Sequence, residues 1–150
     1  MFRVSISITV IYNNAMLCFF CFYNVSSGIQ AKLAFSEVFK HCNIITFDGD
    51  VWIATEFDSQ GIQIRRIQVH SSSSLIRGLK YIDSLVALIV LEVFDRAKVQ
   101  WKPYIVRSCN ELDRYISGVN VGFTFNPKHL YNKLIKYHDT NYEILYDWRR

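Results

Sequence analysis

The sequence predicts an α+β fold, a mostly antiparallel sheet with helices packed against it, and three observations support this prediction. Runs of apolar and β-branched residues fill most of the first half of the chain. An Asp48-Gly49 dipeptide joins two of these runs and is one of the strongest short hairpin signals. The second half contains two segments with helix-capping residues and helical apolar spacing. With 150 residues, of which 51% are hydrophobic, the chain fits a single domain over 1–150 with a substantial core.

Residues 1–23 are predicted to form two strands. The even positions from Phe2 to Tyr12 are apolar and alternate with serine and threonine, which is the period of a half-buried strand. The next apolar run, 15–23, is much shorter than the roughly 20 residues of a membrane-spanning helix. We therefore expect a second strand there and no membrane span. An uncleaved secretion signal is the alternative for these residues.

The hairpin around Asp48-Gly49 carries the first functional prediction. A two-residue turn would place Ile44 opposite Ile53 and His41 directly opposite Glu56, on one face of the sheet. An imidazole held by a carboxylate is half of the apparatus of a general base, and the missing part is a nucleophile. The alternative is a cross-strand charge pair without chemistry.

The remaining elements follow from periodicity and capping residues. We expect a strand from about Gly61 with a bulge at Arg65-Arg66, then a helix entered from the serine run 71–74. The apolar segment 85–94 predicts a strand covered on both faces, with a buried helix as the alternative. A capping box formed by Ser108 and Glu111 predicts a helix that ends near Gly118. Asn126-Pro127 predicts the start of a last helix, with three residues turned inward: Leu130, Leu134 and Ile135.

Charge and composition exclude several classes of function. The formal net charge is +4, but the basic residues are dispersed, so we do not expect nucleic-acid binding. Four cysteines form no obvious disulfide framework for a chain of this size, which favours reduced thiols in a cytosolic setting. The sequence has no glycine-rich phosphate loop and no zinc-hydrolase motif, and we expect no cofactor and no bound metal.

Cys109 is the natural candidate for the nucleophile. It occupies the first position of the predicted capped helix, where unpaired backbone N–H groups and the helix dipole stabilise a thiolate. The dipole contributes only about 0.3–1 kcal/mol, less than one pKa unit, so a nearby imidazolium must supply the rest. His41, oriented by Glu56, would do so if this helix packs on the hairpin. The alternative is a small buried thiol in the core.

Other polar residues offer weaker constellations. Asn43 and Asp58 share the predicted face of His41, and either could orient its ring instead of Glu56. The spacing of Cys18 and Cys21, with His41-Cys42 nearby, suggests a metal site, but the two intervening phenylalanines favour core packing. Three further histidines have no identifiable partner, and Trp52 is expected in the core. The three are His70, His129 and His138.

The order of histidine, acidic residue and then cysteine at a helix start resembles the circularly permuted NlpC/P60-like branch of the papain fold. More narrowly, residues 35–136 resemble a set of small bacteriophage proteins. The motifs that carry this resemblance are His41-Cys42, Asp48-Gly49, Trp52-Ile53 with Glu56, Trp101 to Cys109 with Glu111 and Arg114, Gly118, and Pro127 to Leu134. Residues 1–23 have no counterpart there, which suggests extra N-terminal strands peculiar to this chain.

The resemblance implies a phage-type cysteine hydrolase, an amidase or peptidase that attacks peptidoglycan or another peptide. Cys109 would be its nucleophile, His41 its base and Glu56 its orienting group, with Asp58 open as an alternative because the family position is more often aspartate. The expected location is the virion or the host cytoplasm.

Two further hypotheses stand beside the hydrolase. One is a non-catalytic virion structural or assembly protein that keeps the papain-like fold and binds other virion proteins, with an exposed docking segment at 146–150. The other is metal binding through four residues: Cys18, Cys21, His41 and Cys42.

Overall fold

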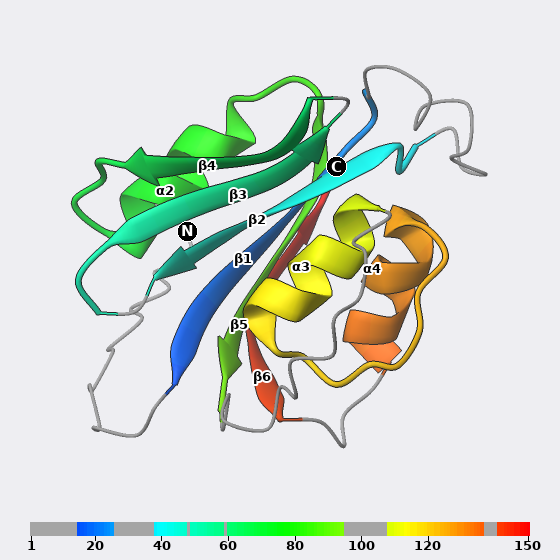
Figure 1. Cartoon of the computed structure of the whole chain (residues 1–150). Coiled ribbons are helices and arrows are strands. Elements are labelled where there is room, and N and C mark those ends of the chain that lie inside the picture. The colour runs from blue at the N-terminus through cyan, green and yellow to red at the C-terminus, as the bar shows by residue number, and fades with distance from the viewer. Residues whose placement is uncertain (1–14, 26–37, 48, 59, 95–107, 137–140) are drawn as a thin grey trace.

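The structure is a computed structural model that describes residues 15–25, 38–47, 49–58, 60–94, 108–136 and 141–150 (Figure 1). These residues form an antiparallel six-stranded sheet in the order β4-β3-β2-β1-β5-β6. The strands are β1 (Met16–Tyr23), β2 (His41–Phe47), β3 (Trp52–Asp58), β4 (Gly61–Ile67), β5 (Leu85–Val93) and β6 (Tyr142–Arg149). With the helices α2 (Ser72–Lys80), α3 (Cys109–Ser117) and α4 (Pro127–Lys136), they confirm the predicted α+β class.

The second of the two predicted N-terminal strands is confirmed as β1, and it occupies the centre of the sheet. It pairs with β2 on one side and with β5 on the other. Its residues from Cys18 to Phe22 have no exposed surface, as expected for a strand covered on both faces. This strand is therefore part of the core and not an addition at an edge. The other predicted strand, before Tyr12, lies outside the described residues.

The helices cover opposite faces of the sheet, with α2 on one face and α3 and α4 on the other (Figure 1). Strand side chains alternate between the two faces, which divides the core into two clusters. Phe20, Cys42 and Ile44 pack in the cluster beneath α3 and α4. Phe19 and Trp52 pack beneath α2, and Trp52 is only 7% exposed, which confirms its expected core position.

The β2–β3 hairpin differs from the prediction in its register. Phe47 pairs with Trp52, two residues beyond the partner that a tight Asp48-Gly49 turn would give it, so residues 48–51 connect the strands. The rings of Phe47 and Trp52 stack with centroids 4.5 Å apart, and the observed register places them directly opposite each other. The predicted pairing of His41 directly opposite Glu56 is therefore wrong. A shift by two residues keeps both on the same face.

The elements that follow β3 agree with the sequence except for one detail. β4 pairs with β3 residue by residue through Arg65 and Arg66, so the predicted bulge is wrong. The hydroxyl of Ser71 caps α2 by accepting a hydrogen bond from the backbone N–H of Ser74 at 3.2 Å. β5 is confirmed as a strand buried on both faces.

Both predicted C-terminal helices are confirmed, with their caps. Ser108 accepts a hydrogen bond from the Glu111 backbone N–H at 3.4 Å, and Gly118 ends α3 at φ 71°, a conformation that favours glycine. Asn126 caps α4 by accepting from the His129 backbone N–H at 2.8 Å. Leu130 and Leu134, predicted to face inward, have no exposed surface.

The C-terminal strand β6 was not predicted. It pairs with β5 at the edge of the sheet, and Tyr146 and Trp148 are half-buried against the cluster beneath α2. The expectation that residues 146–150 form a wholly exposed docking segment is therefore wrong. Among the described residues, no helix has the length and apolar character needed to cross a membrane.

Candidate functional site

The packing of α3 on β2 brings Cys109 and His41 to the same end of the sheet. α3 lies over β2 and β3, and its first turn is at the end where β2 begins (Figure 1). His41 is the first residue of β2 and Cys109 is the first residue of α3. The side chain of each affects the pKa of the other through a hydrogen bond and through charge. These mutual effects indicate that the sulfur and the imidazole lie close to each other.

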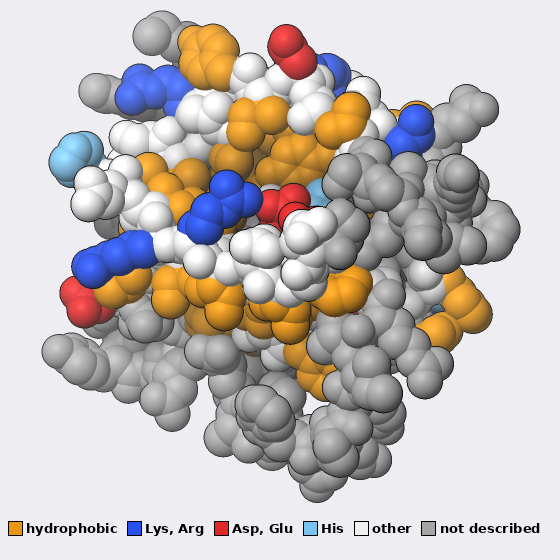
Figure 2. Space-filling view, turned by 45° about the horizontal axis from the view of Figure 1, so that its top comes forward, with side chains coloured by type: hydrophobic (Ala, Val, Ile, Leu, Met, Phe, Trp, Pro, Cys, Tyr) orange, Lys and Arg blue, Asp and Glu red, His pale blue; other side chains and the backbone are white. Residues whose placement is uncertain are grey.

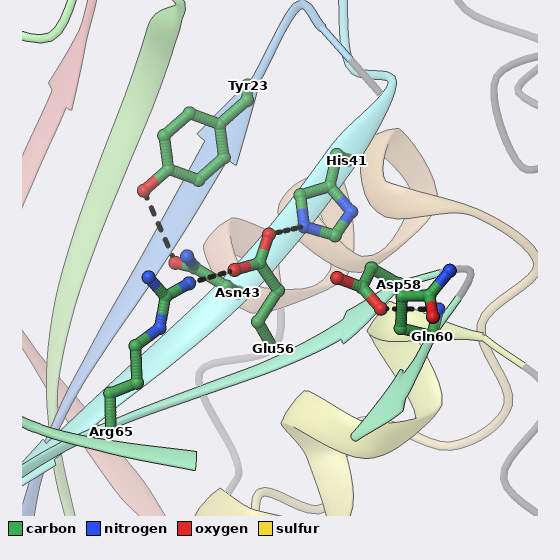
Figure 3. Close-up of polar contacts among 7 residues, drawn as sticks. All are labelled: Tyr23, His41, Asn43, Glu56, Asp58, Gln60 and Arg65. Atoms are coloured by element: carbon green, nitrogen blue, oxygen red, sulfur yellow. Dashed lines mark hydrogen bonds and ion pairs between the residues drawn. The ribbon is translucent and has the colours of Figure 1, made fainter. Parts of the chain in front are cut away.

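Glu56 holds the His41 ring from the neighbouring strand. The Nε2 atom of His41 lies 3.0 Å from Oε1 of Glu56, and the other carboxylate oxygen, Oε2, accepts a hydrogen bond from Nη2 of Arg65 at 2.8 Å (Figure 3). Since Glu56 occupies Nε2, the nitrogen that remains for Cys109 is Nδ1. This division of roles orients the ring.

The other two candidates for the orienting group are engaged elsewhere. Asn43 accepts a hydrogen bond from the Tyr23 hydroxyl at 3.3 Å through its Oδ1 atom. The carboxylate of Asp58 accepts a hydrogen bond from the backbone N–H of Gln60 at 2.7 Å (Figure 3). Of the three residues considered, only Glu56 contacts His41 among the interactions of the described residues.

The surroundings of Cys109 stabilise its thiolate. A hydrogen bond from the side chain of Cys42 is the largest cause of a pKa well below the usual thiol value. Burial opposes it, since the residue is only 4% exposed, but the hydrogen bond and positive charge of His41 reinforce it. The thiolate form is therefore favoured even in this nearly enclosed position.

His41 shows the complementary shift. Burial acts to lower its pKa, but the hydrogen bond and charge of Cys109 and the charge of Glu56 outweigh burial and raise it above 6.5. The raised imidazole pKa and the lowered thiol pKa have the same cause, which is the interaction of the two groups as an ion pair. Both shifts favour a thiolate beside an imidazolium.

The sequence analysis did not place two residues, Cys42 and Asp113, in the surroundings of the Cys109 thiol. Neither has any exposed surface. Burial raises the pKa of the Cys42 thiol well above 9.0, and burial together with the charge of Cys109 raises that of Asp113 well above 3.8. A carboxyl group four residues after Cys109 lies on the same face of the helix, and this spacing could have identified it.

The structure does not support a metal site at the predicted cysteines. Cys18 and Cys21 are three apart on β1 and therefore point to opposite faces, one into each core cluster. The described residues contain no group of histidine, cysteine and acidic side chains that could hold a metal ion. The metal hypothesis is thus wrong for Cys18 and Cys21 acting together.

The remaining histidines lie away from this site or outside the described residues. His70 is exposed. The Nδ1 atom of His129 accepts a hydrogen bond from the backbone N–H of Phe125 at 3.2 Å, and the two rings stack. His138 lies outside the described residues, as does Trp101 of the motif region.

The polar part of the site reaches the surface. The side chain of Glu56 is 25% exposed and that of His41 is 10% exposed. In the space-filling view, acidic side chains lie beside a partly covered histidine, with hydrophobic side chains nearby and basic side chains to one side (Figure 2). Solvent and small molecules can therefore approach the histidine–carboxylate pair from this face.

Comparisons of the chain with models of protein families, with curated proteins and with solved structures find no match. A thiolate at a helix start, an imidazolium beside it and a carboxylate on the far ring nitrogen are the parts required for acyl transfer through a covalent thioester.

Proposed function

We propose that this protein is a cysteine hydrolase that cleaves amide bonds, with Cys109 as nucleophile, His41 as general acid and base, and Glu56 as the orienting group. The observation that carries the proposal is the ordered contact from the Cys109 side chain to His41 and from His41 Nε2 to Glu56 Oε1 at 3.0 Å. The chain order of histidine, acidic residue and cysteine agrees with the resemblance to the permuted NlpC/P60-like branch of the papain fold.

The reaction divides into two acyl transfers. The Cys109 thiolate attacks the carbonyl carbon, and the backbone N–H groups at the start of α3, that of Cys109 included, stabilise the resulting oxyanion. The Nδ1–H of His41 then protonates the departing amine, and the C–N bond breaks to leave a thioester. Neutral His41 next takes a proton from water, whose oxygen attacks the thioester and releases the acid and the thiolate.

The substrate class and setting rest on the resemblance. A small bacteriophage hydrolase would act on a peptide, with the stem peptides of peptidoglycan as the leading candidates, in the virion or the host cytoplasm. The net charge of +4 is compatible with an acidic polymer as substrate.

The test of this proposal is the selective reactivity of one thiol. Iodoacetamide at pH 6–7 should alkylate Cys109 at least about tenfold faster than Cys18 or Cys21, located by peptide mass analysis. Cys21 is a matched internal control, since burial raises its pKa to about 12. His41→Gln should remove the difference. p-Nitrophenyl acetate should leave an acetyl group on Cys109, and equal, slow reaction of all the cysteines would exclude the hydrolase.

The burial of the nucleophile favours a second candidate, a non-catalytic virion protein that keeps the fold. Cys109 is only 4% exposed, and a carbonyl carbon has to come within bonding distance of its sulfur. This candidate predicts that the thiolate forms but that no acyl group transfers to it. Alkylation by iodoacetamide without acylation by the ester would therefore favour the structural protein.

A further inference from the structure

We propose that Cys42 and Cys109 form a reversible disulfide when a hydroperoxide oxidises Cys109, with Asp113 as the base that activates Cys42. This would make the site a redox-modification site, independent of whether it hydrolyses amides. The proposal starts from three buried polar side chains that are enclosed together between β2 and α3: Cys42, Cys109 and Asp113.

The geometry selects one pair from the cysteines described. Cys42 and Cys109 lie in the same core cluster, Cys42 on β2 and Cys109 at the start of the helix α3 that packs over β2. Cys18 shares that cluster but pairs with Thr46, four residues along β2 from Cys42, a distance of about 13 Å along a strand. Cys21 points to the opposite face. A disulfide requires Cα atoms within about 7 Å, so Cys18 and Cys21 are excluded as partners of Cys42, and Cys109 is the described cysteine that remains.

Asp113 is a buried carboxyl group without an evident structural purpose. It has no exposed surface, and neither of its carboxyl oxygens has a hydrogen-bonding nitrogen or oxygen partner among the described residues. The side chains of Cys42 and Cys109 both act on the pKa of this carboxyl group. Orphaned buried polar groups of this kind carry a free-energy cost in the folded protein, so they call for an explanation.

A proton acceptor at Asp113 explains that cost. The Cys109 thiolate attacks a hydroperoxide and becomes a sulfenic acid, while the O–O bond breaks and the other oxygen leaves as hydroxide or alkoxide. Formation of the neutral sulfenic acid removes the Cys109 charge that raises the pKa of Asp113, and Asp113 then gives its proton to the hydroxide or alkoxide released in the first step. The Cys42 sulfur attacks the Cys109 sulfur and passes its own proton to the resulting Asp113 carboxylate. The S–O bond breaks, and the departing hydroxide takes a proton from the His41 imidazolium to form water. Two electrons pass from the thiols to the peroxide, and every proton has an acceptor.

The experiment exposes the whole protein to stoichiometric hydrogen peroxide and maps the cysteines by peptide mass analysis. We expect a Cys42–Cys109 cross-link that dithiothreitol reverses. The wild-type protein is sufficient to detect it. Cys42→Ala should stop the reaction at the sulfenic acid and give a dimedone adduct on Cys109. Cys18→Ala is the matched control, an equally buried cysteine of the same cluster, and should still form the cross-link.

Asp113→Asn tests the base. It should slow the conversion of sulfenic acid into disulfide about tenfold or more, with little change in the rate of the first oxidation. Over-oxidation of Cys109 without a cross-link, or a cross-link to another cysteine, would overturn the pairing. A wild-type rate in Asp113→Asn would overturn the role of the carboxyl group. Failure of ester acylation leaves these readouts unaffected, so the two proposals fail separately.

Discussion

His41 Nε2 lies 3.0 Å from Glu56 Oε1, although the two residues do not face each other across the β2–β3 ladder. The observed register, continued to the start of β2, places Asn43 opposite Glu56, so His41 is its diagonal neighbour. Diagonal neighbours on one face lie about 7–8 Å apart at the backbone, and a glutamate is long enough to span that gap. The length of the side chain therefore makes the contact possible in this register.

Glu56→Gln should reduce the reactivity of Cys109. The substitution keeps the shape of the side chain but removes the charge that helps to raise the His41 pKa. Less imidazolium then stabilises the thiolate, and we expect about a tenfold slower alkylation at pH 7, equivalent to about one pKa unit. The measurement is the rate of iodoacetamide reaction at Cys109 between pH 5 and 9.

Arg65→Gln is the matched control for that change. Arg65 pairs with the same carboxylate at 2.8 Å, but its side chain is 70% exposed. Exposed ion pairs contribute about 0–1 kcal/mol, so the rate at Cys109 should change by less than about threefold. An equal loss in both variants would show that the outer ion pair, and not the carboxylate itself, sets the state of His41.

The sequence allowed most elements and both helix caps to be predicted, because these depend on local signals. Periodicity located β1, β4 and β5, and capping residues located α3 and α4 to within a residue or two. The register of the hairpin depends instead on the stacking of Phe47 on Trp52, which competes with the preference of Asp48-Gly49 for a tight turn. Turn propensities alone do not show whether the aromatic stacking or the tight turn contributes more to stability.

The candidate site was predicted in part for a similar reason. His41, Glu56 and Cys109 carry recognisable chemistry, and their meeting required only that α3 pack on the face of β2. The role of Cys42 depends on which strand lies beneath the first turn of α3, and β6 depends on pairing with a distant strand. Both are tertiary relationships, which a single sequence does not display.

Ser108→Ala should weaken α3 and the thiolate together. Ser108 accepts a hydrogen bond from the Glu111 backbone N–H at the start of the helix, and loss of such a cap costs about 1 kcal/mol. We expect urea unfolding to show this loss and Cys109 to react more slowly. Ser71→Ala removes the equivalent cap of α2 and is the control. It should lower stability by a similar amount and leave the rate at Cys109 unchanged.

Asn110→Ala should destabilise the protein by about 1–3 kcal/mol. The Asn110 side chain is 1% exposed and donates to the carbonyl oxygen and the hydroxyl of Thr124, both at 2.8 Å. Truncation leaves that buried carbonyl oxygen without its donor. Urea unfolding measures the effect, and Asn132→Ala, an exposed position on α4, should stay within about 0.5 kcal/mol of wild type. A small loss in Asn110→Ala would mean that the loop after α3 is held by other contacts.

The contribution of His41 to stability should depend on pH in a defined direction. Its folded-state pKa is raised above 6.5. The stabilisation from His41 is therefore complete below pH 6.5 and is lost as the pH rises through the folded-state pKa. The pKa of Cys109 is lowered from 9.0, so its share is present above 9.0 and is lost as the pH falls through its own folded-state value. The ion pair therefore stabilises the protein most between the two folded-state values.

Urea unfolding of wild type and His41→Gln across pH 5–9 measures this contribution. The difference in the free energy of unfolding should shrink as the pH rises through the folded-state pKa of His41, because neutral imidazole no longer pairs with the thiolate. His70→Gln, at an exposed histidine, is the control and should remain within about 0.5 kcal/mol of wild type. A difference that grows toward alkaline pH would mean that His41 is neutral in the folded protein, and the thiolate–imidazolium pair would then be abandoned.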